Sequence, residues 1–263
     1  GNAVASFQNF FDPDGTIADA SGTDHLGEEI WGYIPFNAFP YLKYLAKPNY
    51  CHLYYNDLSV KLVDASLGCD TLGCTDPDPD DTRQTDSWKT ILVGGMRFGG
   101  ACSGGTPAPP ITGGGYSAYY AIDITDPEQP KPLWEFSDDA LGYTSSQPAI
   151  LRAGGKSENG NWYVAFGSGS QTLPKGTTDI GRTDPGYIYI LNLKTGDLVK
   201  KIGLGDDAVV GDILSIDANK DYDSEKIYFG TAYQSSGAWK GKLMSLAIPS
   251  SASDIMNLCG AGV

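Results

Sequence analysis

Basic side chains are scarce in this sequence. Its 263 residues include 18 Lys and Arg against 32 Asp and Glu, which gives a formal net charge of −14 at pH 7. Proteins that bind nucleic acids through phosphate groups need clustered Lys and Arg side chains that release counterions. The sequence has no basic stripe of this kind, so we expect no nucleic-acid partner.

Long apolar runs are also missing. No run of about 18 apolar residues occurs, so we expect no membrane span. With 41% hydrophobic and 11% aromatic residues, the chain can still bury a large core, and we expect a single domain over residues 1–263. The start Gly1-Asn2-Ala3-Val4 has neither an initiator Met nor a signal-peptide pattern, which favours a processed or excised piece.

Helical periodicity is limited to residues 37–47, which end just before Pro48. The other periodic segments are apolar or alternating runs bounded by Gly, Asp, Asn and Pro, and such runs predict β-strands. We predict strands over residues 30–34, 90–93, 117–124, 147–151, 162–166, 187–193, 212–216, 226–229 and 242–248.

A repeat runs through these strands. A strand that ends in Gly is followed, after a loop, by a second strand, and the glycines concerned are Gly94, Gly167 and Gly230. They lie 73 and then 63 residues apart. This repeat length exceeds the ~40–45 residues of a plain propeller blade, so the loops between the strands must contain insertions. The pattern predicts an all-β fold, a modified β-propeller, with a β-sandwich as the alternative.

Two segments are predicted to be exposed loop insertions. Residues 70–86 carry an Asp-Pro run, and residues 99–115 are rich in Gly and Pro. The Asp-Pro run would hold cations only loosely, because carboxylates spaced by Pro form no fixed cage. Residues 249–263 are expected to form a C-terminal tail.

Five cysteines occur, and none belongs to a C-x-x-C pair. This usage favours disulfides in an exported protein over a zinc site. We predict one disulfide bond between Cys69 and Cys74 and another between Cys51 and Cys102, which leaves Cys259 without a partner in this prediction. The sequence alone does not fix this pairing, and buried free thiols are the alternative.

One motif indicates a binding site, and it lies in the loop between the strands predicted at 212–216 and 226–229. Oxygen-bearing side chains stand at alternate positions of this loop: Asp217, Asn219, Asp221, Asp223 and Glu225. Calcium loops of the EF-hand type use side chains at positions 1, 3 and 5, a backbone carbonyl at 7 and often a water at 9. Because clustered carboxylates repel one another unless a cation lies between them, and nitrogen and sulfur ligands are missing, the pattern predicts calcium.

Two positions differ from an EF-hand. Tyr222 stands at position 6, where Gly is needed, and Tyr228 stands at position 12, where a bidentate Glu is needed. We therefore expect a calcium loop between two strands. The alternative is an acidic hairpin turn that Lys220 and Lys226 partly neutralise.

Catalytic signatures are few. The sequence has no G-x-S-x-G nucleophile elbow, and His25 and His52 stand far from any nucleophile motif. We expect a protein that is not an enzyme; the alternative is a propeller enzyme, either a quinoprotein-like oxidoreductase or a carbohydrate-active one.

A second candidate cation-binding site is Asp12-Pro13-Asp14-Gly15, with Asp19 further on, although an Asp-Gly turn explains this segment more simply.

Several linked motifs resemble one known family. They are GEEIWGYIP at 27–35, PYLKYL at 40–45, YCHLYY at 50–55, WKTILVGG at 88–95, YYAIDITDP at 119–127 and LWEF at 133–136. Together with the calcium-type loop, and in this order over about residues 25–248, they resemble the C-terminal propeller domain of PilY1/PilC-type proteins of bacterial type IV pili.

The resemblance implies a modified seven-bladed propeller on a secreted protein at or near the pilus tip. It implies a calcium-binding protein of the bacterial cell surface that acts in pilus assembly, in the control of extension against retraction, and in adhesion. The implied partners are minor pilins at the pilus tip, the rest of a parent chain, and a host or abiotic surface. The family usually has Asp where Glu225 stands, and a Gly that is missing here. At the observed repeat length the chain holds fewer than seven blades, so strands would be missing or supplied by the parent chain or a partner.

Overall fold

The computed structural model describes residues 4–7, 29–46, 48, 55–68, 87–99, 117–154, 161–171 and 181–258. Within these residues the regular structure is almost entirely β-strand, and every strand pairing is antiparallel. No helix among the described residues has the length and apolar character needed to cross a membrane.

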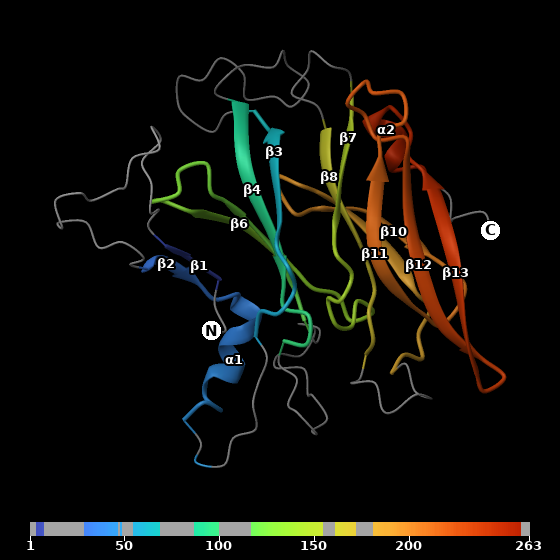
Figure 1. Ribbon diagram of the computed structural model, residues 1–263, viewed down its shortest axis with the longest axis horizontal. Coiled ribbons are helices and arrows are strands. Elements are labelled where there is room, and N and C mark those ends of the chain that lie inside the picture. Colours follow the sequence, from blue (N-terminus) through green and yellow to red (C-terminus); the bar gives the residue numbers. More distant parts are fainter. Residues whose placement is uncertain are drawn as a thin grey trace.

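Three sheets make up most of the described chain, and each is a meander in which strands that follow one another in sequence are neighbours (Figure 1). Sheet I contains β3 (Lys61–Ser66), β4 (Trp88–Gly95), β5 (Tyr119–Asp123) and β6 (Lys131–Phe136). Sheet II contains β7 (Ala149–Ala153), β8 (Asn161–Gly167), β9 (Tyr187–Asn192) and β10 (Leu198–Gly203). Sheet III contains β11 (Ala208–Ile216), β12 (Lys226–Ser235) and β13 (Ala238–Ala247).

Sheet II is buried on both faces. Val164 and Phe166 of β8 point toward sheet I, where the ring of Phe166 stacks on that of Tyr119 with 3.9 Å between centroids. The residues between them along the strand, such as Ala165, point toward sheet III and share a core with Val210 of β11. Because the side chains of a strand alternate between the two faces, a continuous apolar run such as that of β8 requires a covered sheet.

Tyr33, in the N-terminal part of the chain, packs on part of the other face of sheet I, where Leu92, Tyr120 and Ile122 lie. β1 (Val4–Phe7) pairs with β2 (Glu29–Tyr33), and the rings of Tyr33 and Tyr120 lie 5.2 Å apart. η1 (Phe36–Ala38) and α1 (Phe39–Leu42) follow. The helix predicted at 37–47 is therefore shorter than expected, because Tyr44 and Leu45 donate to carbonyls three residues back and form tight turns.

These sheets confirm the predicted all-β, propeller-type fold, with blade-like meanders that stack face to face. The described sheets form an open series rather than a closed ring (Figure 1). The predicted insertion at 70–86, and that at 99–115 apart from Gly99, lie outside the described residues. In the segment expected to be a tail, α2 (Ala252–Ile255) places Ile255 in the core between sheets II and III.

Candidate metal centre

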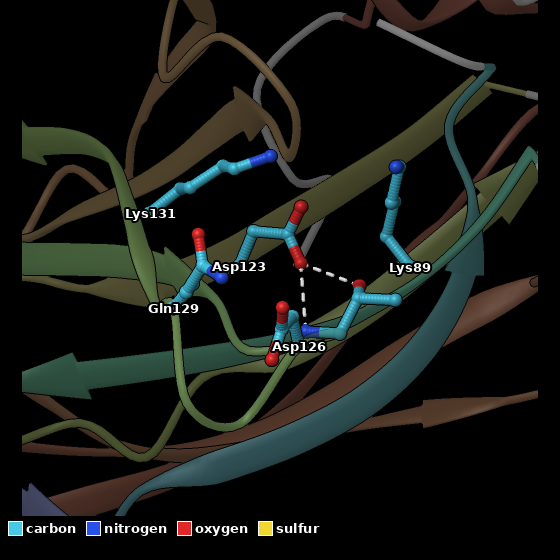
Figure 2. A pocket seen from close by; sticks show the side chains of 6 residues that line it. Lys89, Asp123, Asp126, Gln129 and Lys131 are labelled. Atoms are coloured by element: carbon cyan, nitrogen blue, oxygen red, sulfur yellow. Dashed lines mark hydrogen bonds between the residues drawn. The ribbon is translucent and has the colours of Figure 1, made fainter. Parts of the chain in front are cut away.

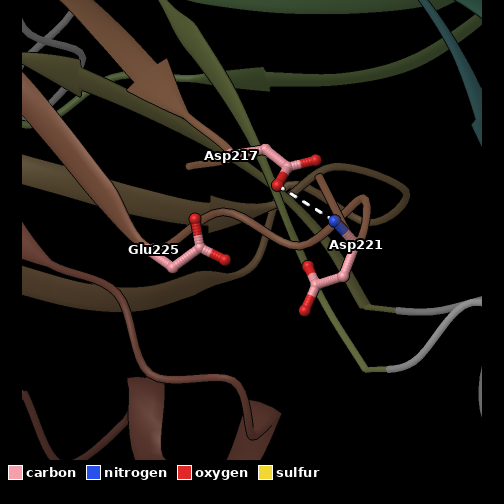
Figure 3. A group of neighbouring side chains, drawn as sticks. All are labelled: Asp217, Asp221 and Glu225. Carbon is pink, nitrogen blue, oxygen red and sulfur yellow. Dashed lines mark hydrogen bonds between the residues drawn. The ribbon is translucent and has the colours of Figure 1, made fainter. Parts of the chain in front are cut away.

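The acidic loop occupies residues 217–225 and joins β11 to β12. The antiparallel pair of Ile216 with Lys226 closes the ladder directly beneath it. Asp217, Asp221 and Glu225 each bring one carboxylate oxygen to within 4.8 Å of the others (Figure 3). Oxygens that share a calcium ion at 2.3–2.6 Å lie no more than about 5 Å apart, so the spacing of the three carboxylates suits that ion.

Backbone N–H groups hold Asp217 in place at the start of the loop. One carboxylate oxygen accepts bonds from the amides of Lys220 at 2.6 Å and Asp221 at 3.1 Å, and the other accepts from Tyr222 at 2.9 Å. These bonds fold the chain around the carboxylate and offset part of the repulsion among the acidic groups. The loop is therefore shaped by its own side chains.

The next two acceptors continue this arrangement. The side-chain oxygen of Asn219 accepts from the Asp221 amide at 2.9 Å, and the Asp221 carboxylate accepts from the Asp223 amide at 3.0 Å. The side-chain amide of Asn219 also donates to Asp221 at 2.9 Å. Asn219 thus lies beside the three carboxylates and orients one of them.

Two residues of the loop adopt the left-handed backbone conformation, Lys220 with φ 63° and Tyr222 with φ 76°. Position 6 of an EF-hand loop is Gly because the chain turns sharply there. Tyr222 stands at that position and takes the conformation that favours Gly, at a cost of about 1–2 kcal/mol for an L-residue. The sharp turn that the sequence appeared to lack is therefore present.

Asp223 points out of the cluster. Its carboxylate accepts from Arg152 Nη1 at 2.6 Å and from the Gly154 amide at 3.3 Å, and Ser224 exchanges two further bonds with Arg152. Asp223 holds position 7, where calcium loops offer the backbone carbonyl rather than the side chain. The structure thus gathers three of the five predicted side chains, places Asn219 beside them and turns Asp223 toward sheet II.

The competing interpretation as a neutralised acidic turn needs Lys220 and Lys226. Among the described residues, no ion pair joins either lysine to Asp217, Asp221 or Glu225. Every side chain of the three-carboxylate group offers oxygen, the donor that hard cations such as calcium prefer. The residues present therefore offer the type of donor that the predicted ion requires.

Arg152 is the residue of this region that sequence reasoning missed. Its side chain is 3% exposed within β7, whose other residues are Ala, Ile and Leu. A single Arg in an otherwise apolar strand is a usable signal, because a buried guanidinium needs a carboxylate partner.

Several further predictions lie outside the described residues, namely those for Cys51, Cys69, Cys74, Cys102, Cys259, His25, His52, Asp12, Asp14 and Asp19.

A second group of polar side chains lines a cavity of about 200 Å³ at one end of sheet I. Figure 2 shows Lys89 and Lys131 on either side of Asp123. Asp123 is buried, and its carboxylate accepts from the amide and the hydroxyl of Thr125. Sheet II repeats this arrangement at the end of β9, where Asn192 accepts from the amides of Lys194 and Thr195. The repeat gives Asp123 a turn-capping role, common to both sheets.

The chain is similar in sequence to several known proteins. A "Type IV pilus biogenesis factor PilY1 homolog" of Xylella fastidiosa is 31% identical over 185 residues, which cover 68% of this chain and 9% of that protein. The chain is a homologue of a segment of PilY1. The PilY1 of Pseudomonas aeruginosa strain PAO1 is 28% identical over 187 residues, which cover 69% of this chain and 12% of that protein. The resemblance predicted from the linked motifs is confirmed.

The chain spans about a tenth of the length of these PilY1 relatives. No protein-family model matches it. Among solved structures, the C-terminal domain of PilY1 from Pseudomonas aeruginosa is similar, with 20% identity, a TM-score of 0.47, and coverage of 87% of this chain and 36% of that one.

Proposed function

We propose that the chain is a calcium-binding, propeller-type region of a type IV pilus biogenesis protein at the bacterial cell surface. The homology to proteins named PilY1 supports the assignment to the pilus system. The names of these relatives describe biogenesis factors, which favours a structural and regulatory role over an enzymatic one. Its partners would be minor pilins at the pilus tip and the rest of a parent chain, and adhesion to host or abiotic surfaces would be a further role.

The observation that carries the calcium proposal is the convergence of Asp217, Asp221 and Glu225 at the turn between two strands. A bound ion would neutralise these carboxylates and tie the ends of β11 and β12 together. Asp223 and Ser224 contact Arg152 in the next sheet. Order created in the loop by calcium would therefore extend to the contact between sheets II and III, where it could act on pilus extension and retraction.

Thermal unfolding with added calcium and with a chelator tests this ion. A ligand that binds only the folded state stabilises it by RT ln(1 + [L]/Kd), about 2.7 kcal/mol at a hundredfold excess over Kd. We expect calcium to raise the Tm of the unaltered chain and to leave that of Asp217→Ala unchanged. Glu128→Ala, which removes an exposed carboxylate far from the loop in sequence, is the matched control and should respond like the unaltered chain. Equal Tm values with calcium and chelator would overturn the proposal.

The pilus role is tested in the bacterium that encodes the chain. With Asp217→Ala introduced at the natural locus, we expect altered surface piliation and pilus-driven motility, while Glu128→Ala leaves both unchanged. Immunoblots of surface fractions must show equal amounts of the two variant proteins. Normal piliation and motility in cells that carry Asp217→Ala would contradict calcium control, and loss of the whole gene without any pilus defect would contradict the pilus assignment.

A further inference from the structure

The cavity at one end of sheet I contains a buried carboxylate oxygen that the fold does not use. Asp123 of β5 lines this cavity and is 6% exposed, whereas Thr125, Asp126 and Gln129 of the following turn are exposed. The amide and the hydroxyl of Thr125 both donate to Oδ1 of Asp123. Among the described residues, no donor bonds to Oδ2. This second oxygen is therefore free to accept from a ligand in the cavity.

Two lysines lie on either side of Asp123. Lys131 of β6 is its direct partner across the strands. On the other side, Ile91 of β4 is the partner, and Lys89 stands two residues before it. Because side chains alternate along a strand, both lysines project from the same face as Asp123. Figure 2 shows the two ammonium groups on the side toward which the unused oxygen of Asp123 points. In the part of the chain that the structure describes, neither lysine forms an ion pair.

The turn does not account for these lysines. Sheet II has the same capped turn, with Asn192 as the capping residue. The strand register places Asn161 there at the position that corresponds to Lys89. Asp197 lies beside Asn192, where sheet I has Lys131. The capped turn thus forms in sheet II without a lysine at either position, and the pair of lysines is a feature of the cavity in sheet I.

The charges that line the cavity balance, because the two ammonium groups lie with two carboxylates, those of Asp123 and Asp126. The lysines would repel a simple cation. An anion placed against both lysines would meet Oδ2 of Asp123 and would approach a chain of net charge −14. A neutral ligand meets neither obstacle. A hydroxyl group offers one donor and two acceptors, so it can donate to the carboxylate and accept from an ammonium group at the same time.

The volume of the cavity limits the size of the ligand. Sites for drug-sized molecules occupy about 300–1,000 Å³, so a cavity of about 200 Å³ suits a single small ring. A pyranose presents adjacent hydroxyl groups on a rigid ring, and several contacts therefore form at little cost in conformational entropy. We propose that this cavity binds a neutral sugar residue, whose hydroxyl groups donate to Asp123 and accept from Lys89 and Lys131. The site is separate from the acidic loop. Its use in adhesion would rest on the proposed function, whereas sugar binding itself does not.

Titration of the isotope-labelled chain, followed by the chemical shifts of its amides, tests this site. The probes are the methyl glycosides of glucose, galactose, mannose and N-acetylglucosamine, each in the millimolar range, with a chelator present so that calcium does not contribute. We expect at least one glycoside to shift amides within residues 123–131. Sodium sulfate and glycine, a simple anion and a zwitterion, should leave these amides unshifted. The chelator makes the result independent of the proposed calcium site.

Two variants change the cavity while the turn remains capped. In Asp123→Asn the side-chain oxygen still accepts from the turn, as that of Asn192 does in sheet II, but the unused acceptor becomes a donor. Lys131→Met removes one ammonium group. Each variant should raise the Kd of the glycoside tenfold or more, because hydrogen bonds to charged groups are the strong ones. Lys240→Met, at an exposed position of β13, is the matched control and should leave the Kd unchanged. Circular dichroism confirms that each variant is folded.

Three results would overturn the proposal. The first is that no glycoside shifts amides within residues 123–131. The second is that sulfate or glycine shifts them and the glycosides do not, because the cavity would then be an anion or zwitterion site. The third is an unchanged Kd in folded Asp123→Asn or Lys131→Met, because the sugar would then bind elsewhere. Weakened binding in both variants, with normal binding in Lys240→Met, supports the proposal.

Discussion

Arg152 of β7 and Asp223 of the acidic loop form a buried ion pair, with 2.6 Å between Nη1 and Oδ1. The two side chains are 3% and 12% exposed. The Arg152 guanidinium also lies 5.8 Å from the ring centroid of Trp162 on β8. This pair joins sheet II to the loop that enters sheet III, and it fixes one end of the candidate calcium site.

Removal of the guanidinium should destabilise the chain strongly. Arg152→Met leaves the Asp223 carboxylate buried without its charged partner, a change that costs about 3–5 kcal/mol in comparable pairs. The free energy of unfolding in urea measures this loss. Arg152→Met combined with Asp223→Leu should recover much of it, because neither charge then remains buried.

The control for this prediction is the exposed ion pair of Arg97 with Asp57, whose side chains are 45% and 41% exposed and lie 3.4 Å apart. Arg97→Met should cost less than about 1 kcal/mol, since water screens and solvates such pairs. If Arg152→Met and Arg97→Met lowered the free energy of unfolding equally, the buried pair would contribute no more to stability than the exposed pair does.

The left-handed backbone at Tyr222 predicts that Gly is more stable than Ala there, whereas Ala should be more stable than Gly at Lys226. Tyr222 has a φ of 76°, so Tyr222→Gly should be more stable than Tyr222→Ala by about 1 kcal/mol. At Lys226, in the regular strand β12, the order should reverse, with Gly less stable than Ala by roughly 0.5–1 kcal/mol. Urea denaturation of the four variants measures both differences. The same order at both sites would contradict the left-handed conformation of Tyr222.

Asp138 should make the stability of the chain depend on pH. Burial opposes ionisation of Asp138, yet hydrogen bonds from Lys201, Tyr189 and the Ala140 amide outweigh it and hold the pKa of this carboxyl below its ordinary value. A lowered folded-state pKa means that the ionised group stabilises the fold at pH values above about 4, and that this stabilisation is lost as pH falls through the folded-state value.

The matching experiment compares the unaltered chain with Asp138→Asn from pH 7 down to about pH 2.5. The difference in unfolding free energy should be largest near neutrality and shrink below about pH 4. Asp139→Asn, which removes the neighbouring exposed carboxylate, is the control for a simple change in net charge. A difference that stays constant over the whole range would contradict the assignment to Asp138.

The inner strands of the fold could be predicted from the sequence, and so could the edge strands β7, β11 and β13, whereas several other edge strands could not. β4, β5, β8 and β9 are apolar runs because neighbouring strands and sheets cover them. The strands that were missed include β3, β6 and β10, which lie at sheet edges. Their sequences mix Lys, Asp, Glu and Pro with apolar residues, a composition typical of protected edges, so their periodicity is weak.

The acidic loop was predictable because it is a local feature. Its oxygen donors recur at every second position, and the hydrogen bonds accepted by Asp217, Asn219 and Asp221 join residues two to five positions apart. The conformation of Tyr222 was not predictable, because a Tyr gives no signal for a left-handed turn. The partner of Asp223 was also hidden, since Arg152 lies 71 residues away in sequence.

The sequence by itself determined the all-β class, the inner strands and the acidic turn, since each depends on neighbours along the chain through side-chain alternation and local hydrogen bonds. Tertiary structure alone decided which acidic side chains gather and which one pairs with Arg152. These outcomes depend on how sheets I, II and III stack, and stacking brings together residues whose distance in sequence carries no information about their contact.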